Sequence, residues 1–190
     1  LLGTVAARDE ELGYRTLLVT GDKDAYQLAS DLTKIVTTKR GITDVVIYGP
    51  EEVEERYGVT PAQFTDFLGL KGDKADNIPV VPGIGDKKAA SMLQAYGNLE
   101  GIYANLDKFK GKQLENLTNY KDDAFLSRQV ATIVRDADFE LDLESISFPN
   151  FNVEQVTEAF TDVRMMAHLA KILKLQGLSL IHISEPTRRS

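Results

Sequence analysis

The first fifty residues contain short apolar runs rich in β-branched residues, which predict the strands of a buried sheet. The runs lie at 16–20, 34–38 and 45–48. The first run ends directly at Gly21 and Asp22, as a buried parallel strand does. An amphipathic helix that stops at Gly13 precedes this run, and one or two helical turns over 24–30 follow it. The alternation of helix and strand predicts an α/β fold, of which this chain contains part of a parallel sheet.

After the strands, the apolar residues recur at the spacing of helices. Thr60 and Gln63 form a capping box at the start of one helix. In the segment 86–97, Asp86 is predicted to cap a helix that Gly97 ends. Further helices are predicted at 98–106, 112–119, 122–132, 153–161 and 163–175, with a loop that contains a short extended piece at 136–148.

The composition is that of a globular protein, with 43% hydrophobic and 27% charged residues. No apolar run approaches the ~18 residues of a membrane-spanning helix, so no membrane association is expected. The absence of cysteine excludes disulfides and thiolate metal sites, and it fits a cytoplasmic location. Because the only histidines are His168 and His182, any metal must be held mainly by oxygen, which favours Mg²⁺ or Mn²⁺.

The net charge of −7 argues at first against a nucleic-acid partner. However, the charge is unevenly distributed. The segment 71–121 contains eight lysines and six acidic residues, a balance of +2, whereas the remainder has 14 basic and 23 acidic residues, a balance of −9. A basic segment within an acidic protein keeps nucleic-acid binding possible.

A glycine pair in this basic segment has the features of a phosphate-binding turn. Gly83, Ile84 and Gly85 precede a predicted helix N-terminus, and Lys87 and Lys88 follow in its first turn. Glycines allow a phosphate to approach the backbone closely, and the free N–H groups of the helix favour an anion. The stretch resembles a helix–hairpin–helix motif, which binds a nucleic-acid backbone without reading bases. A tight turn between two helices is the structural alternative.

Two pairs of aspartates suggest a metal site. Asp22 and Asp24 follow the C-terminal end of a predicted strand, where open α/β sheets bind their ligands. Asp73 and Asp76 are three residues apart and face the same way on a helical turn. If the pairs converge, a divalent cation could lie between them and a phosphate. Taken singly, each aspartate could instead cap a helix or close a turn.

An EF-hand is excluded as the source of the first aspartate pair. A calcium loop starting at Asp22 would place Tyr26 at its fifth position and Thr33 at its twelfth, where that loop requires oxygen ligands.

Three motifs in this order resemble the 5′-nuclease family, and most closely the 5′→3′ exonuclease domain of bacterial DNA polymerase I. The motifs are Thr20-Gly21-Asp22-Lys23-Asp24, then Gly72-Asp73-Lys74-Ala75-Asp76-Asn77-Ile78-Pro79, then Pro82-Gly83-Ile84-Gly85-Asp86-Lys87. The resemblance extends from Leu1 to about Gly177 and implies a partial PIN-like sheet followed by a helical region with a helix–hairpin–helix motif. It also implies metal-dependent 5′→3′ exonuclease or 5′-flap endonuclease activity on DNA in replication and repair.

The resemblance also assigns roles to particular residues. It implies that Asp22, Asp24, Asp73 and Asp76 help to hold two divalent metals. It also implies that the hairpin binds duplex DNA near a 5′ end or flap and that its backbone carbonyls bind K⁺. A polymerase domain on the C-terminal side and a monomeric state are expected from the same resemblance.

The chain departs from the family at two positions and at both ends. Val80 stands where the family usually has glycine, and Lys88 where it often has threonine. The family's remaining metal ligands and its helical arch lie upstream of Leu1, so we expect an incomplete metal site and a nearly inactive fragment. The segment 178–190 breaks the preceding periodicity and resembles a translated transposase-type sequencing adapter, which we interpret as a non-native tail.

The predicted regions are therefore residues 1–60 as the C-terminal part of the nuclease core, 61–135 as a DNA-binding helical region, 136–177 as helices that pack back on the core, and the tail. Two other functions stay open: a non-catalytic helix–hairpin–helix module that only binds duplex DNA, and a related nuclease that cuts RNA.

Overall fold

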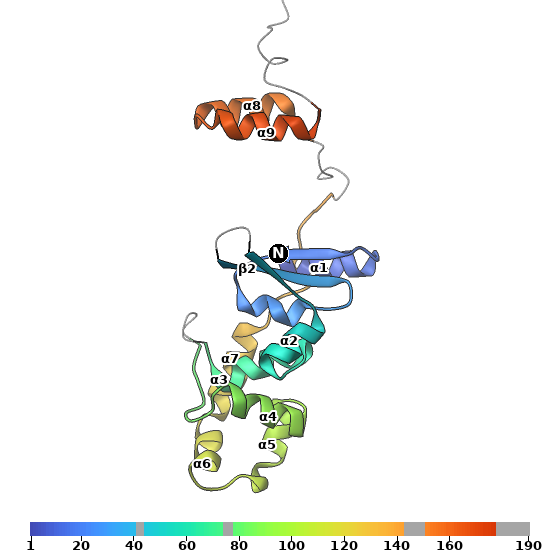
Figure 1. The fold of residues 1–190 in the computed structure, drawn as a ribbon. Helices are drawn as coiled ribbons and strands as arrows, with labels where there is room; N and C mark the ends of the chain where they lie inside the picture. Colours follow the sequence, from blue (N-terminus) through green and yellow to red (C-terminus); the bar gives the residue numbers. More distant parts are fainter. Residues whose placement is uncertain (41–43, 74–77, 143–150, 178–190) are drawn as a thin grey trace, which may run out of the picture. The chain divides into compact units, whose positions relative to one another are not determined.

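The structure is a computed structural model that describes residues 1–40, 44–73, 78–142 and 151–177. The chain divides into two units, Leu1–Ala137 and Asp138–Ser190 (Figure 1). The first unit contains a three-stranded sheet and the helices predicted to bind DNA. Within the described ranges, no helix is long and apolar enough to cross a bilayer.

The sheet has the strand order β1-β2-β3, with bounds β1 (Thr16–Val19), β2 (Thr33–Arg40) and β3 (Asp44–Tyr48). Strands β1 and β2 are parallel, as predicted, and Leu18, Ile35 and Tyr48 form one buried row across the sheet. Strand β3 is antiparallel to β2, so the expected purely parallel sheet is wrong at this strand. Only residues 41–43 separate the two strands, whereas a parallel return needs a crossover of roughly a dozen residues.

Two helices and a 3₁₀ segment complete the sheet region. Helix α1 (Leu2–Glu11) precedes β1, η1 (Lys23–Leu28) connects β1 to β2, and α2 (Pro50–Tyr57) follows β3. Helix α2 begins where the Gly49 amide donates to Glu52 at 2.7 Å, and it ends at Gly58, whose φ of 72° gives the left-handed turn that glycine favours.

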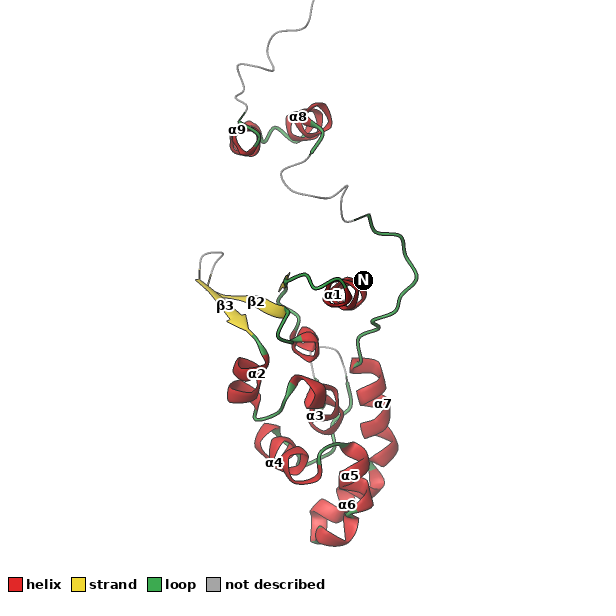
Figure 2. Cartoon of the chain, turned by 90° about the vertical axis from the view of Figure 1, so that its right-hand side faces the viewer, coloured by secondary structure: helices red, strands yellow, loops and turns green. Residues whose placement is uncertain are grey.

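The helical region follows the sheet along the chain. Its elements are η2 (Pro61–Gln63), α3 (Phe64–Lys71), α4 (Asp86–Tyr96), α5 (Leu99–Ala104), η3 (Leu106–Lys108), α6 (Gly111–Asn119) and α7 (Lys121–Ala131). Helix α3 lies at the centre and packs against α4 and α7 (Figure 2). At Gly69, an added Cβ would meet the Ala124 carbonyl oxygen at 2.8 Å, so a glycine permits the close approach of α3 and α7.

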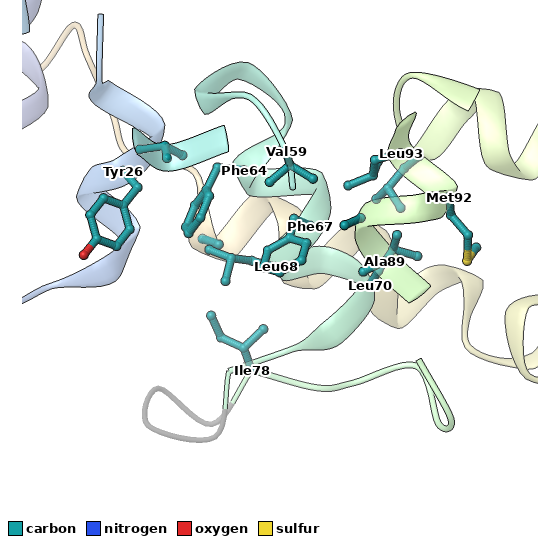
Figure 3. Close-up of a cluster of buried hydrophobic side chains, with 14 of the residues drawn as sticks. Tyr26, Val59, Phe64, Phe67, Leu68, Leu70, Ile78, Ala89, Met92 and Leu93 are labelled. Carbon is teal, nitrogen blue, oxygen red and sulfur yellow. The ribbon is translucent and has the colours of Figure 1, made fainter. Parts of the chain in front are cut away.

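An aromatic cluster joins the sheet region to the helices. The rings of Tyr26 and Phe64 are 5.6 Å apart, and those of Tyr57 and Phe64 are 5.2 Å apart, both in edge-to-face contact. Phe64 and Phe67 are almost fully buried and lie beside Leu68 in the same core (Figure 3). Edge-to-face pairs add about 0.5–1.5 kcal/mol to the stabilisation that burial gives. The core therefore fixes η1 and the end of β1 relative to α3.

The second unit contains helices α8 (Val153–Asp162) and α9 (Met166–Leu175), which lie side by side (Figure 1). Leu169 and Leu173 of α9 are fully buried, and the Gln176 side chain donates to the Phe151 carbonyl oxygen at 3.2 Å. Both helices confirm the sequence prediction, while the expected packing of this region on the nuclease core stays a prediction.

Candidate metal and nucleic-acid site

Asp22 caps the 3₁₀ segment that follows β1. Its Oδ1 accepts a hydrogen bond from the Asp24 amide at 2.9 Å, and its own amide donates to the Thr20 hydroxyl at 3.1 Å. The capping role, which the sequence left open as an alternative, is thus present in the structure. It does not prevent metal binding, because a carboxylate has about four lone-pair sites and the cap uses one. Asp22 is exposed and Asp24 is half-buried.

Asp73 follows α3 and pairs with Ile78. The Ile78 amide donates to the Asp73 carbonyl at 2.7 Å, and the Asp73 amide donates to the Ile78 carbonyl at 3.3 Å. Gly72 makes this turn possible: its φ is 66° and its ψ 177°, and a Cβ there would lie 2.6 Å from the Pro79 carbonyl oxygen. Asp76 lies outside the described residues, so its place relative to Asp73 stays a prediction.

A cavity of about 260 Å³ connects the two aspartate segments and the hairpin. It is lined by Lys23, Lys71, Gly72, Asp73, Ile78, Val80, Gly85 and Asp86. Lys23 stands between Asp22 and Asp24, so the segment after β1 and the segment after α3 reach the same cavity. The sequence alone could not show this convergence.

The described carboxylates that line this cavity are Asp73 and Asp86, and neither Asp22 nor Asp24 is among its lining residues. Carboxylate oxygens are the ligands that Mg²⁺ and Mn²⁺ prefer. Among residues 1–73, 78–142 and 151–177, other than 41–43, no three Asp, Glu or His side chains come close enough to hold a metal. A metal ion held between the two aspartate pairs therefore stays a prediction, and it would require further ligands.

The hairpin of residues 81–85 is a turn between α3 and α4. The Val81 amide donates to the Leu70 carbonyl at 3.0 Å, and the Ile84 amide donates to the Val81 carbonyl at 3.1 Å. Ile84 is buried, whereas Gly83 and Gly85 are exposed. Only Gly83 needs a glycine for its conformation, with φ at 78°. At Gly85 no atom lies within 4 Å of an added Cβ, which leaves the backbone accessible to a phosphate.

Three side chains from three helices hold the carbonyl groups of this turn and of the residues before it. Asn116 of α6 donates to the Pro82 carbonyl at 2.6 Å, Ser127 of α7 to the Pro79 carbonyl at 3.1 Å, and Lys88 of α4 to the Gly83 carbonyl at 2.9 Å. Asn116 and Ser127 are buried. Neither residue is predicted from the sequence, because nothing in the local pattern relates it to a turn more than thirty positions away.

The start of α4 differs from the prediction. The N-cap is Gly85, and Asp86 is the first helical residue with no capping hydrogen bond from its side chain. Instead, Asp86 forms an ion pair with Lys71 at 3.3 Å. A carboxylate in the first helical turn is still favourable, because it faces the positive end of the helix dipole. Lys87 is exposed in the same turn, where it could meet a phosphate.

Comparison with known proteins identifies the family of this chain. Residues 59–154, about half of the chain, match the family described as 5′-3′ exonuclease, C-terminal SAM fold. The chain belongs to the 5′-3′ exonuclease family. This exonuclease-family chain is 43% identical over 173 residues to DNA polymerase I of Bacillus caldotenax, covering 90% of the chain and 20% of that protein. It is 45% identical over 173 residues to DNA polymerase I of Geobacillus stearothermophilus, with the same coverage.

The chain thus spans about a fifth of the length of these relatives. The fold of the exonuclease-family chain is also similar to that of a 5′-exonuclease from bacteriophage T5 with bound zinc, with a TM-score of 0.59 and 23% identity over 68% of this chain and 48% of the phage protein. The resemblance to the 5′-nuclease family is confirmed, and so is the predicted α/β fold with a helical region.

Proposed function

We propose that this chain forms part of a metal-dependent 5′-nuclease that hydrolyses DNA from a 5′ end or at a 5′ flap. The observation that carries the proposal is the shared cavity beside the hairpin, which Lys23 and Asp73 line together with Gly85. Family membership and the identity to two DNA polymerases I support it. A flap endonuclease of bacteriophage T5, solved in a complex with DNA and metal ions, has a similar fold with a TM-score of 0.57.

In this proposal, Asp22, Asp24, Asp73 and Asp76 hold divalent metal ions, Mg²⁺ or Mn²⁺, together with carboxylates from outside the described residues. Such ions would supply a hydroxide nucleophile and stabilise the charge that develops on the phosphate. The chain's own residues position the ions, with Asp22 held by its cap and Asp73 by its backbone pairing with Ile78.

The hairpin has the second role in the proposal. Gly83, Ile84 and Gly85 present backbone amides to a phosphate of the duplex, and Lys87 adds a positive charge at the helix N-terminus. Lys88 adds a charge next to the turn while one of its N–H groups holds the Gly83 carbonyl. The predicted K⁺ site on hairpin carbonyls and the polymerase domain on the C-terminal side belong to the same proposal.

A DNA-binding module without catalysis is the second candidate. It is favoured by the cap that Asp22 forms and by the absence, among the described residues, of three acidic or histidine side chains close enough to hold a metal. In that case the aspartates are structural, and DNA affinity does not depend on divalent metal.

Cleavage assays on a hybrid protein test the proposal. Residues 1–177 of this chain replace the matching segment of the G. stearothermophilus polymerase, and the hybrid is given a labelled 5′-flap DNA duplex in Mg²⁺ or in EDTA. Mg²⁺-dependent release of the flap is expected. Flap binding without cleavage by a folded hybrid would support the binding module instead. Preferential cleavage of an RNA strand of the same sequence would identify an RNA-cutting nuclease.

A further inference from the structure

A second, larger cavity adjoins the candidate metal site and carries a strong positive charge. Its volume is about 740 Å³, and it is lined by Lys23, Arg56, Tyr57, Gly58, Lys71, Asp86, Lys87, Ala90, Ser91 and Gln94. Four of these side chains are cationic and one is anionic. Lys23, Lys71 and Asp86 line this cavity and the smaller one beside Asp73, so the two cavities are neighbours.

The four cations come from four elements that the core holds in place. Lys23 begins η1, Arg56 lies near the end of α2, Lys71 ends α3, and Lys87 lies in the first turn of α4. Lys71 lies over the ring of Phe67, with its Nζ 5.2 Å from the centre of the ring. Since these elements share one hydrophobic core, the positive charges are brought together by the fold and not by a run of sequence.

Arg56 is oriented by two tyrosines. Its guanidinium lies 5.2 Å from the ring centre of Tyr48 and 5.3 Å from that of Tyr57, and it donates a hydrogen bond to the Tyr48 hydroxyl. A guanidinium has five N–H donors, so several are left for a ligand. Burial, together with Tyr26, raises the pKa of Tyr57 to about 12, which keeps the hydroxyl of this wall residue neutral.

The uncharged polar side chains of the cavity already have partners. The Ser91 hydroxyl donates to the Lys87 carbonyl at 2.9 Å, and the Gln94 amide donates to the Gly58 carbonyl at 2.7 Å. Lys71 is paired with Asp86, but Asp86 is a single carboxylate among four cations. The cavity therefore retains an excess of positive charge, which an anion with several oxygens would neutralise.

We propose that this cavity, which we call the α2–α4 groove, binds a backbone phosphate of the DNA strand that passes the metal site, with Arg56 and Lys71 as its principal ligands. The proposal rests on the proposed function. It extends the DNA-binding surface from the hairpin towards α2, a part of the chain that the sequence did not mark as DNA-binding. A free nucleotide offers the same phosphate chemistry, and the experiment separates the two.

Fluorescence anisotropy with a labelled 5′-flap duplex, measured on the whole chain in Ca²⁺ at several salt concentrations, tests the groove. For Arg56→Gln and for Lys71→Met, we expect roughly 3- to 10-fold weaker binding and a loss of about 0.9 from the slope of log affinity against log salt, which is the effect of one lost phosphate contact. Arg15→Gln is the matched control. Arg15 is exposed and precedes β1, at the opposite end of the strand from Lys23.

The groove is tested with both Arg56→Gln and Lys71→Met, so that one variant remains informative if the other does not fold. Thermal unfolding shows whether each variant is folded. Unchanged affinity and slope in a folded Lys71→Met variant would overturn the proposal. A second outcome would also overturn it. If a deoxynucleoside monophosphate binds the wild-type chain but not the two variants, and does not displace the flap duplex, then the groove holds a free nucleotide and not a backbone phosphate of DNA. Failure of the wild-type chain to bind any DNA would instead refute the proposed function.

Discussion

The Asn116 side chain donates a 2.6 Å hydrogen bond to the Pro82 carbonyl, which ties helix α6 to the hairpin. Asn116→Ala removes this donor and leaves a carbonyl without its partner, so we expect a loss of about 1–3 kcal/mol in the free energy of unfolding. We also expect weaker binding of duplex DNA, because the hairpin amides lose their fixed orientation. Urea denaturation and anisotropy measure the two effects. The exposed Asn119 of the same helix is the control, and equal effects of the two alanines would contradict this role.

Gly72 is required for the position of Asp73. Its backbone conformation is one that other residues rarely adopt, and a Cβ would meet the Pro79 and Ile78 carbonyl oxygens at 2.6 and 2.7 Å. Gly72→Ala is expected to cost about 3 kcal/mol or more, from strain and from displacement of the Asp73 pairing.

Gly13→Ala provides the comparison for this substitution. Gly13 also has a positive φ of 76°, but no atom lies within 4 Å of an added Cβ, so only the backbone strain of about 1–2 kcal/mol is expected. Thermal or chemical unfolding of both variants gives the two values. Similar losses would show that the contacts around Gly72 do not matter.

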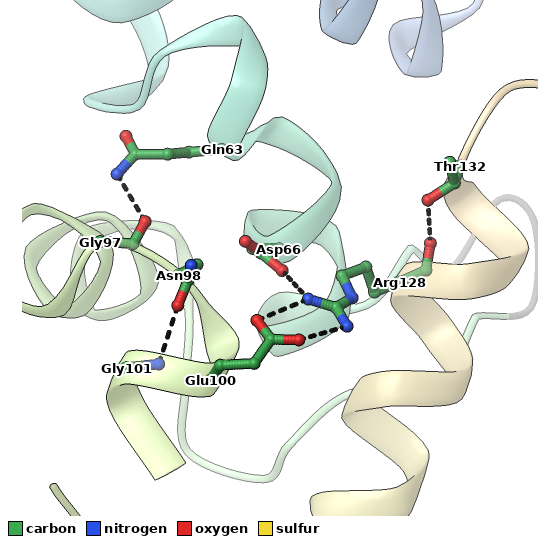
Figure 4. Close-up of polar contacts among 8 residues, drawn as sticks. All are labelled: Gln63, Asp66, Gly97, Asn98, Glu100, Gly101, Arg128 and Thr132. Atoms are coloured by element: carbon green, nitrogen blue, oxygen red, sulfur yellow. Dashed lines mark hydrogen bonds and ion pairs between the residues drawn. The ribbon is translucent and has the colours of Figure 1, made fainter. Parts of the chain in front are cut away.

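Arg128 neutralises a buried carboxylate between α3 and α7. It donates to Asp66 at 3.0 Å and to both oxygens of Glu100 at 2.9 and 2.7 Å (Figure 4). Asp66 is 5% exposed. Arg128→Met would leave this charge unpaired and is expected to cost roughly 3–5 kcal/mol, of which Asp66→Asn in the same protein restores a part. A double variant no more stable than the single one would contradict this.

The pH dependence of this variant has a defined sign. Burial raises the pKa of Asp66, and the hydrogen bond and charge of Arg128 oppose the rise. A carboxyl whose pKa is raised by folding binds its proton more tightly in the folded state than in the unfolded state. Its ionisation therefore lowers the free energy of unfolding increasingly as the pH rises above 3.8, the ordinary pKa of an aspartate. The destabilisation by Arg128→Met is therefore expected to be larger at pH 7 than at pH 4.

Glu10 gives the opposite pH dependence. Burial raises its pKa, but hydrogen bonds from Ser30 and Thr33 and the charge of Arg135 outweigh this effect and bring the pKa below 4.5. The stabilisation is therefore present above pH 4.5 and is lost as the pH falls through the lowered value. Glu10→Gln is expected to lose about 1–2 kcal/mol at pH 7 and progressively less as the pH falls below 4.5, as measured by urea denaturation. A loss that does not depend on pH would argue against an ionised Glu10.

Local sequence patterns predicted the elements and the motifs well, because these depend on residues near one another. The strand 16–20, the hairpin at Gly83 and the helix 86–97 agree with β1, the observed turn and α4. The antiparallel direction of β3 also has a local cause, because the connection after β2 is too short for a parallel return. The assignment of Asp86 as a cap failed because its partner, Lys71, comes from the end of another helix.

Contacts between distant segments could not be predicted in this way. Asn116 and Ser127 reach the hairpin from α6 and α7, and Arg56 and Lys71 line one cavity because the aromatic core brings α2 and α3 together. The convergence of Asp73 with the segment after β1 is of the same kind. Such contacts depend on packing, which leaves no periodic mark in the sequence.

Single-turnover cleavage of the 5′-flap duplex by the hybrid polymerase, in Mg²⁺, tests the central claim most directly when Asp73→Asn is compared with Asp31→Asn. Asp31 is exposed and precedes β2, away from the end of β1 where Asp22 lies. A bound metal stabilises the charge of the transition state by several kcal/mol, and losing this stabilisation lowers the rate by about 100-fold or more. We predict a reduction of this size for Asp73→Asn, with unchanged folding. Rates within about threefold of each other for the two variants would contradict a metal-holding role for Asp73.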